Sequence, residues 1–349
     1  MAIKTNFTAG LLSVTGDNAD DAITVNRNAA GQILINGGAI PVQTDAQEVQ
    51  PTLANTTEID VFGGNGNDMI SLDNVAPPAG QALPTAHLFG GNGNDTLIGG
   101  AGNDILDGGA GDDTVVGGKG TDTAFLGAGN DTFIWNPGDG NDKVDGGNGF
   151  DTLDFKGKTA GETFSIDANG SGATFNRTNG TIDLTSVERI QFEAQGQFAD
   201  NITINDLTGT GVKQVAIDLG GGDPDGNGDG QADTVNIFTT NRDPITVSDS
   251  NGVVTVSGLA STVTISNFEA DLDQLFVNGH IVTVTDGQTV TVNNTGGTST
   301  ASDGSHAAGL ALLGQAMASS FVTTGDGHGA TPIADPPASQ PPLLAQPHA

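Results

Sequence analysis

Between residues 90 and 134 the chain alternates polar and apolar stretches with a constant period of nine residues. Each unit has six positions rich in Gly, Asn and Asp, followed by three that are mostly Thr and large apolar residues: GGNGNDTLI, GGAGNDILD, GGAGDDTVV, GGKGTDTAF and LGAGNDTFI. Gly, Asn and Asp tolerate positive φ and form tight turns, whereas Thr, Ile and Val favour extended backbone. Each unit is therefore predicted to be one turn followed by one short strand.

The second residue after the aspartate of each unit is mostly apolar. Side chains alternate between the faces of a strand, so a strand of three residues, about 10 Å long, directs only its middle side chain inward. Two units then form one flattened coil of 18 residues, and stacked coils bury a narrow core that no coil buries alone. The predicted inward residues are Ile70, Leu97, Leu106, Val115, Ala124, Phe133, Val144 and Leu153.

The repeat also has irregular and weakened copies. A slip of two residues in WNPGDGNDKVD precedes Asp142 and Asp151, and we expect it to break the regularity of the stack. The unit GGNGNDMIS places Asp68 apart from the contiguous units. Weaker copies, GDNADDAITV and QGQFADNITI, lie among short predicted strands in the flanks. They favour one longer, less regular β-solenoid; separate sandwich-like modules on either side are the alternative.

The fold class predicted is therefore all-β, with a helical and disordered C-terminal tail. Its helix covers DGSHAAGLALLGQAMASSF, where Leu310, Leu313, Met317 and Phe321 lie near one face. The Pro-rich residues after it predict disorder. Four regions follow: 1–62, an irregular β region with a degenerate repeat; 63–155, the regular roll; 156–298, a β-rich solenoid-like region; and 299–349, the helix and tail.

Composition adds a strong preference for cations. The 349 residues include 42 acidic and 10 basic side chains, a net charge of −32, which repels itself when the chain is compact. This charge argues against nucleic acid and anionic membranes as partners and favours metal ions. Without cysteine, disulfides, thiolate metal sites and cysteine nucleophiles are excluded. The sequence has no run of 18 apolar residues, so we predict no membrane-spanning helix.

Stacking the coils gathers aspartates at two edges. Asp95, Asp113 and Asp131 share one edge, and Asp104 and Asp122 share the other. Carboxylates one coil apart, about 4.8 Å, repel each other, while the glycines leave backbone carbonyl oxygens free to converge. Such oxygens suit Ca²⁺, which takes about 6–8 of them at about 2.3–2.6 Å, whereas Zn²⁺ requires the His or Cys that the array lacks. The repeats are therefore predicted to fold when Ca²⁺ binds.

The unit GGxGxDxUx resembles the repeat of the hemolysin-type, or repeats-in-toxin (RTX), calcium-binding proteins that Gram-negative bacteria secrete. The resemblance covers residues 90–155 and 63–71. It implies a parallel β-roll, export by a type I secretion exporter, and Ca²⁺ ligation by sixth-position aspartates and turn carbonyls. The implied ligands are Asp68, Gly91, Gly93, Asp95, Gly100, Gly102, Asp104, Gly109, Gly111, Asp113, Gly118, Gly120, Asp122, Asp131, Asp142 and Asp151.

A second acidic segment, DPDGNGDGQAD, predicts a possible separate Ca²⁺ loop. Asp225, Asn227, Asp229 and Asp233 occupy positions 1, 3, 5 and 9, and a glycine occupies position 6, as in an EF-hand loop. The twelfth position is Asn236 instead of a bidentate Glu, and no helices flank the segment. A polar loop between strands is the alternative.

The remaining motifs concern activity and location. The sequence contains neither HExxH nor GxSxG, so we expect no metalloprotease or lipase activity, and we predict a non-catalytic, secreted protein with a surface, matrix or adhesive role. The alternative is a secreted carbohydrate-active enzyme or lectin-like module that uses the flanking β regions and binds a glycan or cell-surface partner. The opening residues lack the apolar core of a cleavable signal peptide. Together with the resemblance to RTX proteins, the lack of this apolar core predicts an extracellular protein whose uncleaved export signal lies in residues 300–349.

Overall fold

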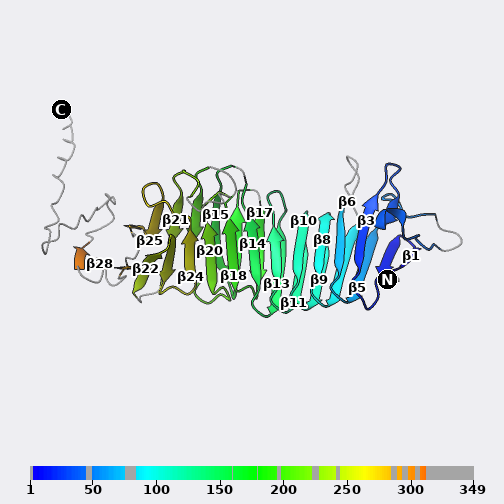
Figure 1. Cartoon of the computed structure of the whole chain (residues 1–349), viewed down its shortest axis with the longest axis horizontal. Helices are drawn as coiled ribbons and strands as arrows, with labels where there is room; N and C mark the ends of the chain where they lie inside the picture. Colours follow the sequence, from blue (N-terminus) through cyan, green and yellow to red (C-terminus); the bar gives the residue numbers. More distant parts are fainter. Residues whose placement is uncertain are drawn as a thin grey trace, which may run out of the picture.

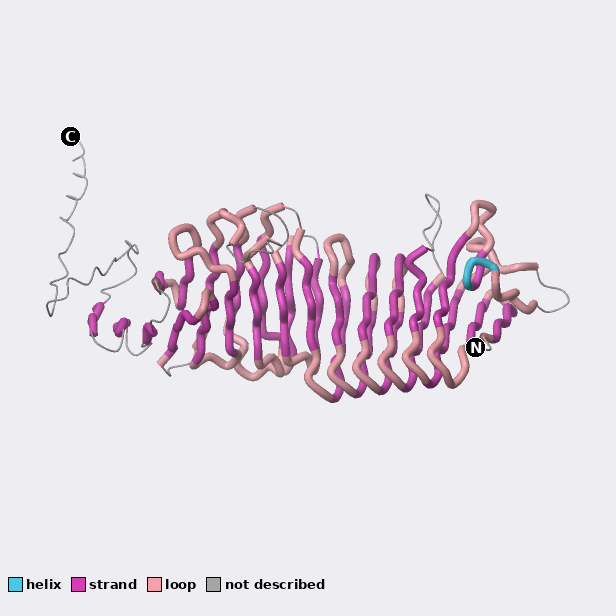
Figure 2. Tube along the Cα trace, viewed as in Figure 1, coloured by secondary structure: helices cyan, strands magenta, loops and turns pink. Residues whose placement is uncertain are grey.

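The computed structural model describes residues 3–44, 49–74, 84–158, 160–178, 180–194, 198–221, 228–240, 244–283, 289–292, 298–302 and 307–311. Within these ranges the chain is an elongated stack of β-coils (Figure 1). Two long sheets, here called sheet A and sheet B, enclose one continuous hydrophobic core. Figure 2 shows the connecting loops gathered at the two edges of the stack.

Sheet A has 14 strands. In spatial order they are β1 (Lys4–Thr8), β2 (Leu11–Thr15), β5 (Glu58–Asn65), β7 (Thr85–Asn92), β9 (Ile105–Ala110), β11 (Thr123–Ala128), β13 (Asp142–Asn148), β17 (Gly180–Thr185), β16 (Gly172–Arg177), β15 (Thr163–Asn169), β19 (Asn201–Ile204), β21 (Thr234–Ile237), β25 (Gln274–Val277) and β26 (His280–Val282).

Sheet B has 13 strands. In spatial order they are β27 (Thr289–Val292), β22 (Ile245–Ser250), β23 (Val253–Ser257), β24 (Thr262–Ser266), β20 (Gln214–Asp218), β18 (Arg189–Glu193), β14 (Thr152–Lys156), β12 (Thr132–Trp135), β10 (Thr114–Lys119), β8 (Thr96–Ala101), β6 (Met69–Asn74), β3 (Ala22–Arg27) and β4 (Ile33–Ile35). The helical element among the described residues is the 3-10 turn η1 (Asn36–Gly38), and no described helix has the length and apolar character to cross a membrane.

From β5 to β14 successive strands alternate between the two sheets, and each pairs in parallel with the strand one coil further on. Leu97 lies opposite Val115 in sheet B, and Leu106 lies opposite Ala124 in sheet A, a shift of 18 residues. The predicted coil is therefore confirmed. Strands such as β8 and β10 have six residues where three were predicted, because the parallel pairing continues into the glycines, with Gly100 opposite Gly118.

The predicted inward residues form two buried rows, one on each sheet. In sheet B the row passes from Ile70 through Leu97, Val115 and Phe133 to Leu153, and in sheet A from Leu106 through Ala124 to Val144, with Leu88, which was not predicted, before Leu106. All of them are at most 2% exposed. The apolar position of the repeat therefore builds the core of the roll, as the period predicts.

The two-residue slip does not break the stack, and that prediction is wrong. After β12 ends at Trp135, the chain forms a longer connection and enters β13 in register, with Ala124 opposite Val144 and Gly127 opposite Gly147. Two extra residues in a surface turn change neither the inward rows nor the parallel pairing, since loops tolerate insertions that strands do not. The coil at this point simply has 20 residues, the separation of Asp122 and Asp142.

Beyond the roll the same two sheets continue, which confirms one long solenoid over separate sandwich modules. Two antiparallel meanders interrupt the coiling: β15–β16–β17 widens sheet A, and β22–β23–β24 widens sheet B. The wider coils hold larger side chains, and Phe155 contacts Trp135, Phe175 and Phe192 with ring centroids 4.7–5.5 Å apart. The core is thus narrow in the repeats and aromatic directly after them.

The predicted C-terminal helix differs from the structure where residues are described. Ala307–Ala311 form β29, which pairs antiparallel with β28 (Thr298–Ser302). Backbone pairing within this hairpin satisfies hydrogen-bond donors and acceptors that a helix would satisfy locally. Residues 312–349, which include Leu313, Met317, Phe321 and the Pro-rich tail, lie outside the described residues.

Candidate calcium sites

The sixth-position aspartates are joined by hydrogen bonds at one edge of the stack, here called the first ladder. The backbone N–H of each aspartate donates to Oδ1 of the aspartate one coil further on. The N···Oδ1 distance is 2.7 Å for the pairs Asp68 to Asp95, Asp95 to Asp113, and Asp113 to Asp131. The same contact, 2.9 Å long, joins Asp131 to Asp151. The predicted grouping of Asp95, Asp113 and Asp131 at one edge is confirmed.

The second ladder lies at the opposite edge, where the chain enters sheet A. Asp104 N–H donates to Asp122 Oδ1 and Asp122 N–H donates to Asp142 Oδ1, both at 2.8 Å. The ladder starts where Ala86 N–H donates to Asp104 Oδ1 at 3.2 Å. Each aspartate therefore uses one carboxylate oxygen to hold the preceding coil in register.

The other carboxylate oxygen of each of these aspartates is buried and has no hydrogen-bond donor. These atoms are Oδ2 of Asp68, Asp95, Asp104, Asp113, Asp122, Asp131, Asp142 and Asp151, and the residues are at most 2% exposed. A buried carboxylate oxygen without a donor is costly unless a proton or a cation neutralises it. The ladders are therefore rows of buried acceptor oxygens without donors, which suit a positive ion.

Burial raises the pKa of these carboxyl groups well above its usual range. The pKa is about 6 for Asp95, Asp122 and Asp151, and about 7 for Asp104, Asp113 and Asp142. Desolvation is the largest cause, and repulsion from Asp122, the neighbouring aspartate in the ladder, adds to it at Asp104 and Asp142. Without a metal ion, the folded ladders thus hold protons that the unfolded chain releases near pH 4.

In the units that begin with glycine, this first glycine forms the wall of a small pocket beside the unpartnered oxygen. At Gly108 an added Cβ would lie 2.5 Å from Asp113 Oδ2 and closer still to the carbonyl oxygen of Leu126 in the next coil. Gly63, Gly90 and Gly99 have the same two kinds of neighbour. A carboxylate oxygen and a carbonyl oxygen from adjacent coils therefore converge where a side chain is missing, and this hard-oxygen donor set fits Ca²⁺.

The glycines at the second and fourth positions of the unit have a different role. Gly109 and Gly111 have φ of 105° and 128°, a region that L-residues with side chains rarely adopt. Their Cα atoms pack against the carbonyl oxygens of Gly91 and Gly93 in the preceding coil. Gly118 and Gly120 pack in the same way on the predicted carbonyl ligands Gly100 and Gly102. The predicted ligand carbonyls thus lie within the stacked turns and point along the stack.

The first ladder is longer than the sequence analysis predicts. Asp68 does not stand apart: Asp21 N–H donates to its Oδ1 at 2.7 Å, and Gly16 packs against the Gly63 carbonyl oxygen and Asp21 Oδ2. At the other end, Asp151 N–H donates to Glu188 Oε2 at 2.9 Å. The segment GDNADD lacks the two turn glycines but keeps the first glycine and the sixth-position aspartate. The spacing of this glycine and this aspartate was the signal in the sequence for a further coil.

A third ladder runs through the C-terminal half. Glu162 N–H donates to Asp200 Oδ1, Asp200 N–H to Asp233 Oδ1, and Asp233 N–H to Asp273 Oδ1, at 2.6–2.9 Å. Among the described residues, none of its carboxyl oxygens is both fully buried and without a partner. It therefore lacks the feature that marks the other two ladders as cation sites.

The predicted separate loop is only partly described. Asp225 and Asn227 lie outside the described residues. Asp229 is buried and its Oδ1 accepts the Gln231 N–H at 2.8 Å, while Asp233 belongs to the third ladder. A separate Ca²⁺ loop here stays a prediction.

Comparison with protein families identifies the repeats. A family model of the RTX calcium-binding nonapeptide repeat matches residues 89–124, 108–134 and 138–154. The chain contains RTX repeats. The matches cover the RTX coils from β7 to β14 and the ladder residues from Asp95 to Asp151, whereas Asp21, Asp68 and Glu188 extend the first ladder beyond them. Comparison with curated proteins finds no match.

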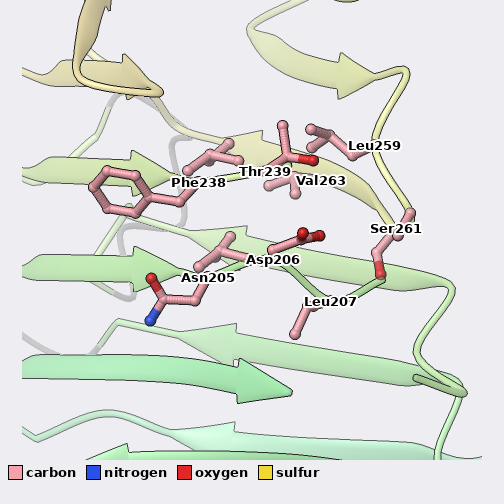
Figure 3. A pocket seen from close by; sticks show the side chains of 11 residues that line it. Asn205, Asp206, Leu207, Phe238, Thr239, Leu259, Ser261 and Val263 are labelled. Carbon is pink, nitrogen blue, oxygen red and sulfur yellow. The ribbon is translucent and has the colours of Figure 1, made fainter. Parts of the chain in front are cut away.

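Outside the ladders, a shallow and mostly apolar depression lies beside β19, β21 and β24 (Figure 3). Phe238, 42% exposed, is its aromatic side chain and Asp206 its acid. Burial would raise the pKa of Asp206, but hydrogen bonds from Thr208 and Thr240 lower it to about 2. Asp206 is thus held ionised by local structure, and a carbohydrate-active role for this region stays a prediction.

Proposed function

We propose that this RTX protein is secreted unfolded, folds when Ca²⁺ fills the pockets of the first and second ladders, and then has a non-catalytic surface, matrix or adhesive role. The RTX repeats themselves support calcium binding. The observation that carries the proposal is the set of buried Oδ2 atoms without a donor, most of which face the first glycine of their unit; Asp131 and Asp142, whose units begin with Leu126 and Pro137, are the exceptions. A folded chain must neutralise these atoms, and no lysine or arginine reaches them among the described residues.

The ladder residues prepare the site in two ways. Oδ1 of each aspartate holds the coils in register by accepting a backbone N–H, so the carboxylate has a fixed orientation. The missing Cβ of the first glycine leaves room beside Oδ2 and the carbonyl oxygen of the next coil. Bound Ca²⁺ would supply the positive charge that these oxygens lack and would relieve repulsion between adjacent carboxylates.

The size of the effect supports folding outside the cell. At about 1 mM Ca²⁺ and a Kd of about 0.1 mM, one site stabilises the folded chain by about 1.4 kcal/mol. Several such sites together approach the usual stability of a domain, about 5–15 kcal/mol. At the far lower calcium concentration of a cytosol the same sites contribute almost nothing, so a chain of charge −32 stays unfolded until export.

Circular dichroism of the full chain in chelator and in calcium tests the proposal. We expect a weak β signal in chelator at pH 7.5 and a cooperative gain as calcium rises to several millimolar, with magnesium as the control ion. Mg²⁺ requires near-ideal octahedral geometry and loses its water reluctantly, so it should be a poor substitute. Identical β spectra in chelator and calcium would contradict calcium-dependent folding.

A further inference from the structure

The outer face of sheet A carries a group of metal-ligating side chains that belongs to none of the ladders. Glu58 and Asp60 lie on β5, and His87 lies on β7. Asp60 is directly opposite His87 in the parallel register, and Glu58 is two residues before Asp60, so all three side chains are on one face. One ligand atom from each lies within 4.8 Å of the others.

The distances in this group fit a shared metal ion better than a hydrogen bond. His87 Nδ1 is 3.3 Å from Glu58 Oε1 and 3.3 Å from Asp60 Oδ1. A charge-assisted N–H to carboxylate hydrogen bond is about 2.7–2.9 Å long. Ligand atoms held at about 2.0–2.1 Å from a tetrahedral Zn²⁺ are separated from each other by about 3.3–3.4 Å. The imidazole nitrogen is therefore as far from both oxygens as two neighbouring zinc ligands are.

A second observation concerns the Asp60 oxygen itself. Oδ1 of Asp60, the atom that faces His87, is buried and has no hydrogen-bond partner. The side chains of Asp60 and His87 are 20% and 26% exposed, so this corner of the cluster is screened while the rest is reachable from solvent. An unsatisfied carboxylate oxygen aimed at an imidazole nitrogen is what a site prepared for a cation requires.

Aromatic rings shield one side of the cluster. Phe62 and Phe89 stack with ring centroids 4.8 Å apart, and Phe89 meets the His87 ring edge-on at 6.5 Å. Such a shell fixes the orientation of a ligand and lowers the local dielectric, both of which strengthen metal binding. The exposed side near Glu58, whose side chain is 43% exposed, leaves space for water as a fourth ligand.

We propose that Glu58, Asp60 and His87 bind one divalent transition-metal ion of the Zn²⁺ class, with one coordination position open to solvent. The chemistry separates this site from the calcium ladders, because Ca²⁺ takes about 6–8 oxygen ligands whereas an imidazole with two carboxylates suits Zn²⁺. The net charge of −32 raises the local concentration of any divalent cation. The proposal goes beyond calcium binding and does not depend on it.

Calorimetric titration of Zn²⁺ into the full chain, kept in saturating calcium, tests the proposal. His87→Ala should weaken the site by at least about 100-fold, since loss of even a supporting neighbour of a ligand costs about 10–100-fold. His280→Ala is the matched control, because His280 lies on β26 near the far end of the same sheet. Both variants keep the histidines of the C-terminal tail, so any zinc that these histidines bind is the same in both titrations.

Two further measurements keep the test decisive. Co²⁺ in place of Zn²⁺ should give the visible absorption of a four-coordinate site in the unmodified chain and in His280→Ala, and not in His87→Ala. If His87→Ala loses its calcium-induced dichroism, His87→Gln and Asp60→Asn replace it. Zinc affinity and cobalt absorption that are unchanged in the folded variants would overturn the proposal.

Discussion

Replacing Gly108 by alanine adds one methyl group to the wall of one pocket of the first ladder. Gly108 lies in β9 with a φ outside the left-handed region, so its backbone accepts alanine without strain. An unstrained Gly→Ala change ordinarily stabilises a protein by about 0.4–1 kcal/mol. Here the opposite is expected, because the new Cβ would lie 2.5 Å from Asp113 Oδ2 and even closer to the Leu126 carbonyl oxygen.

The magnitude follows from the loss of one site. At about 1 mM Ca²⁺ and a Kd of about 0.1 mM, Gly108→Ala should lose about 1.4 kcal/mol of stability beyond any steric cost. Above the Kd, each bound ion adds about 1.4 kcal/mol for every tenfold rise in calcium. The slope of the unfolding free energy against the logarithm of calcium concentration should therefore fall by that amount. A purely steric effect would lower stability equally at all calcium concentrations and leave the slope unchanged.

Urea unfolding at a series of calcium concentrations measures this slope. The matched control is Gly211→Ala, where the nearest neighbours of the added Cβ, the carbonyl oxygens of Ser171 and Val187, are 3.9 Å away and φ is again outside the left-handed region. The control should keep the slope of the unmodified chain. A slope for Gly108→Ala equal to that of the control would refute the assignment of this pocket as a calcium site.

Three other predictions concern charge, pH and export. Asp113→Asn keeps an acceptor for the Asp95 N–H but removes a charge, so it should raise the β signal in chelator at pH 7.5 and lower the urea midpoint in calcium; circular dichroism in chelator and urea unfolding in calcium check this, and a gain in both or a loss in both would contradict it. Burial raises the pKa of Asp113 to about 7 and of Asp95 to about 6, so the contribution of these two carboxyl groups to the stability of the metal-free fold should be fully present below pH 4 and lost as the pH rises through 6–7. Calcium binding at pH 7 should accordingly release protons, which calorimetry in two buffers of different ionisation enthalpy detects; equal heats in both buffers would exclude proton release. Finally, residues 300–349 should be required for release into the medium through a co-expressed type I exporter, and secretion of a chain truncated at residue 299 at the level of the full chain would rule out a signal there.

The period of nine was sufficient to predict the inward rows and the two edges, because both depend only on spacing along the chain. It could not identify the role of the first glycine. A glycine can be required because φ is positive or because a side chain would fill a binding pocket. The sequence does not distinguish these reasons at Gly108, whereas the structure shows an ordinary φ and two oxygens where a Cβ would lie. The role of Gly109 and Gly111, by contrast, agrees with the turn that the sequence predicts, since both have positive φ.

The remaining differences have local causes. Asp21 was missed as a ladder residue because Asp17 and Ala19 replace the glycines of its turn, although the hydrogen bond to Asp68 is the same as elsewhere in the ladder. The slip before Asp142 was misjudged because two residues added to a turn leave the strand register intact. The meander β15–β16–β17 has no nine-residue period and became visible only through its pairing.

Anomalous X-ray scattering from crystals of the calcium-loaded chain, with terbium exchanged for calcium, tests the central claim most directly. The account predicts metal peaks in two rows along the edges of the stack, each beside the Oδ2 atom of a ladder aspartate, with the Gly108 pocket among them. A folded chain whose two edges carry no metal peaks, with Asp95, Asp104 and Asp113 hydrogen-bonded as protonated acids, would contradict it.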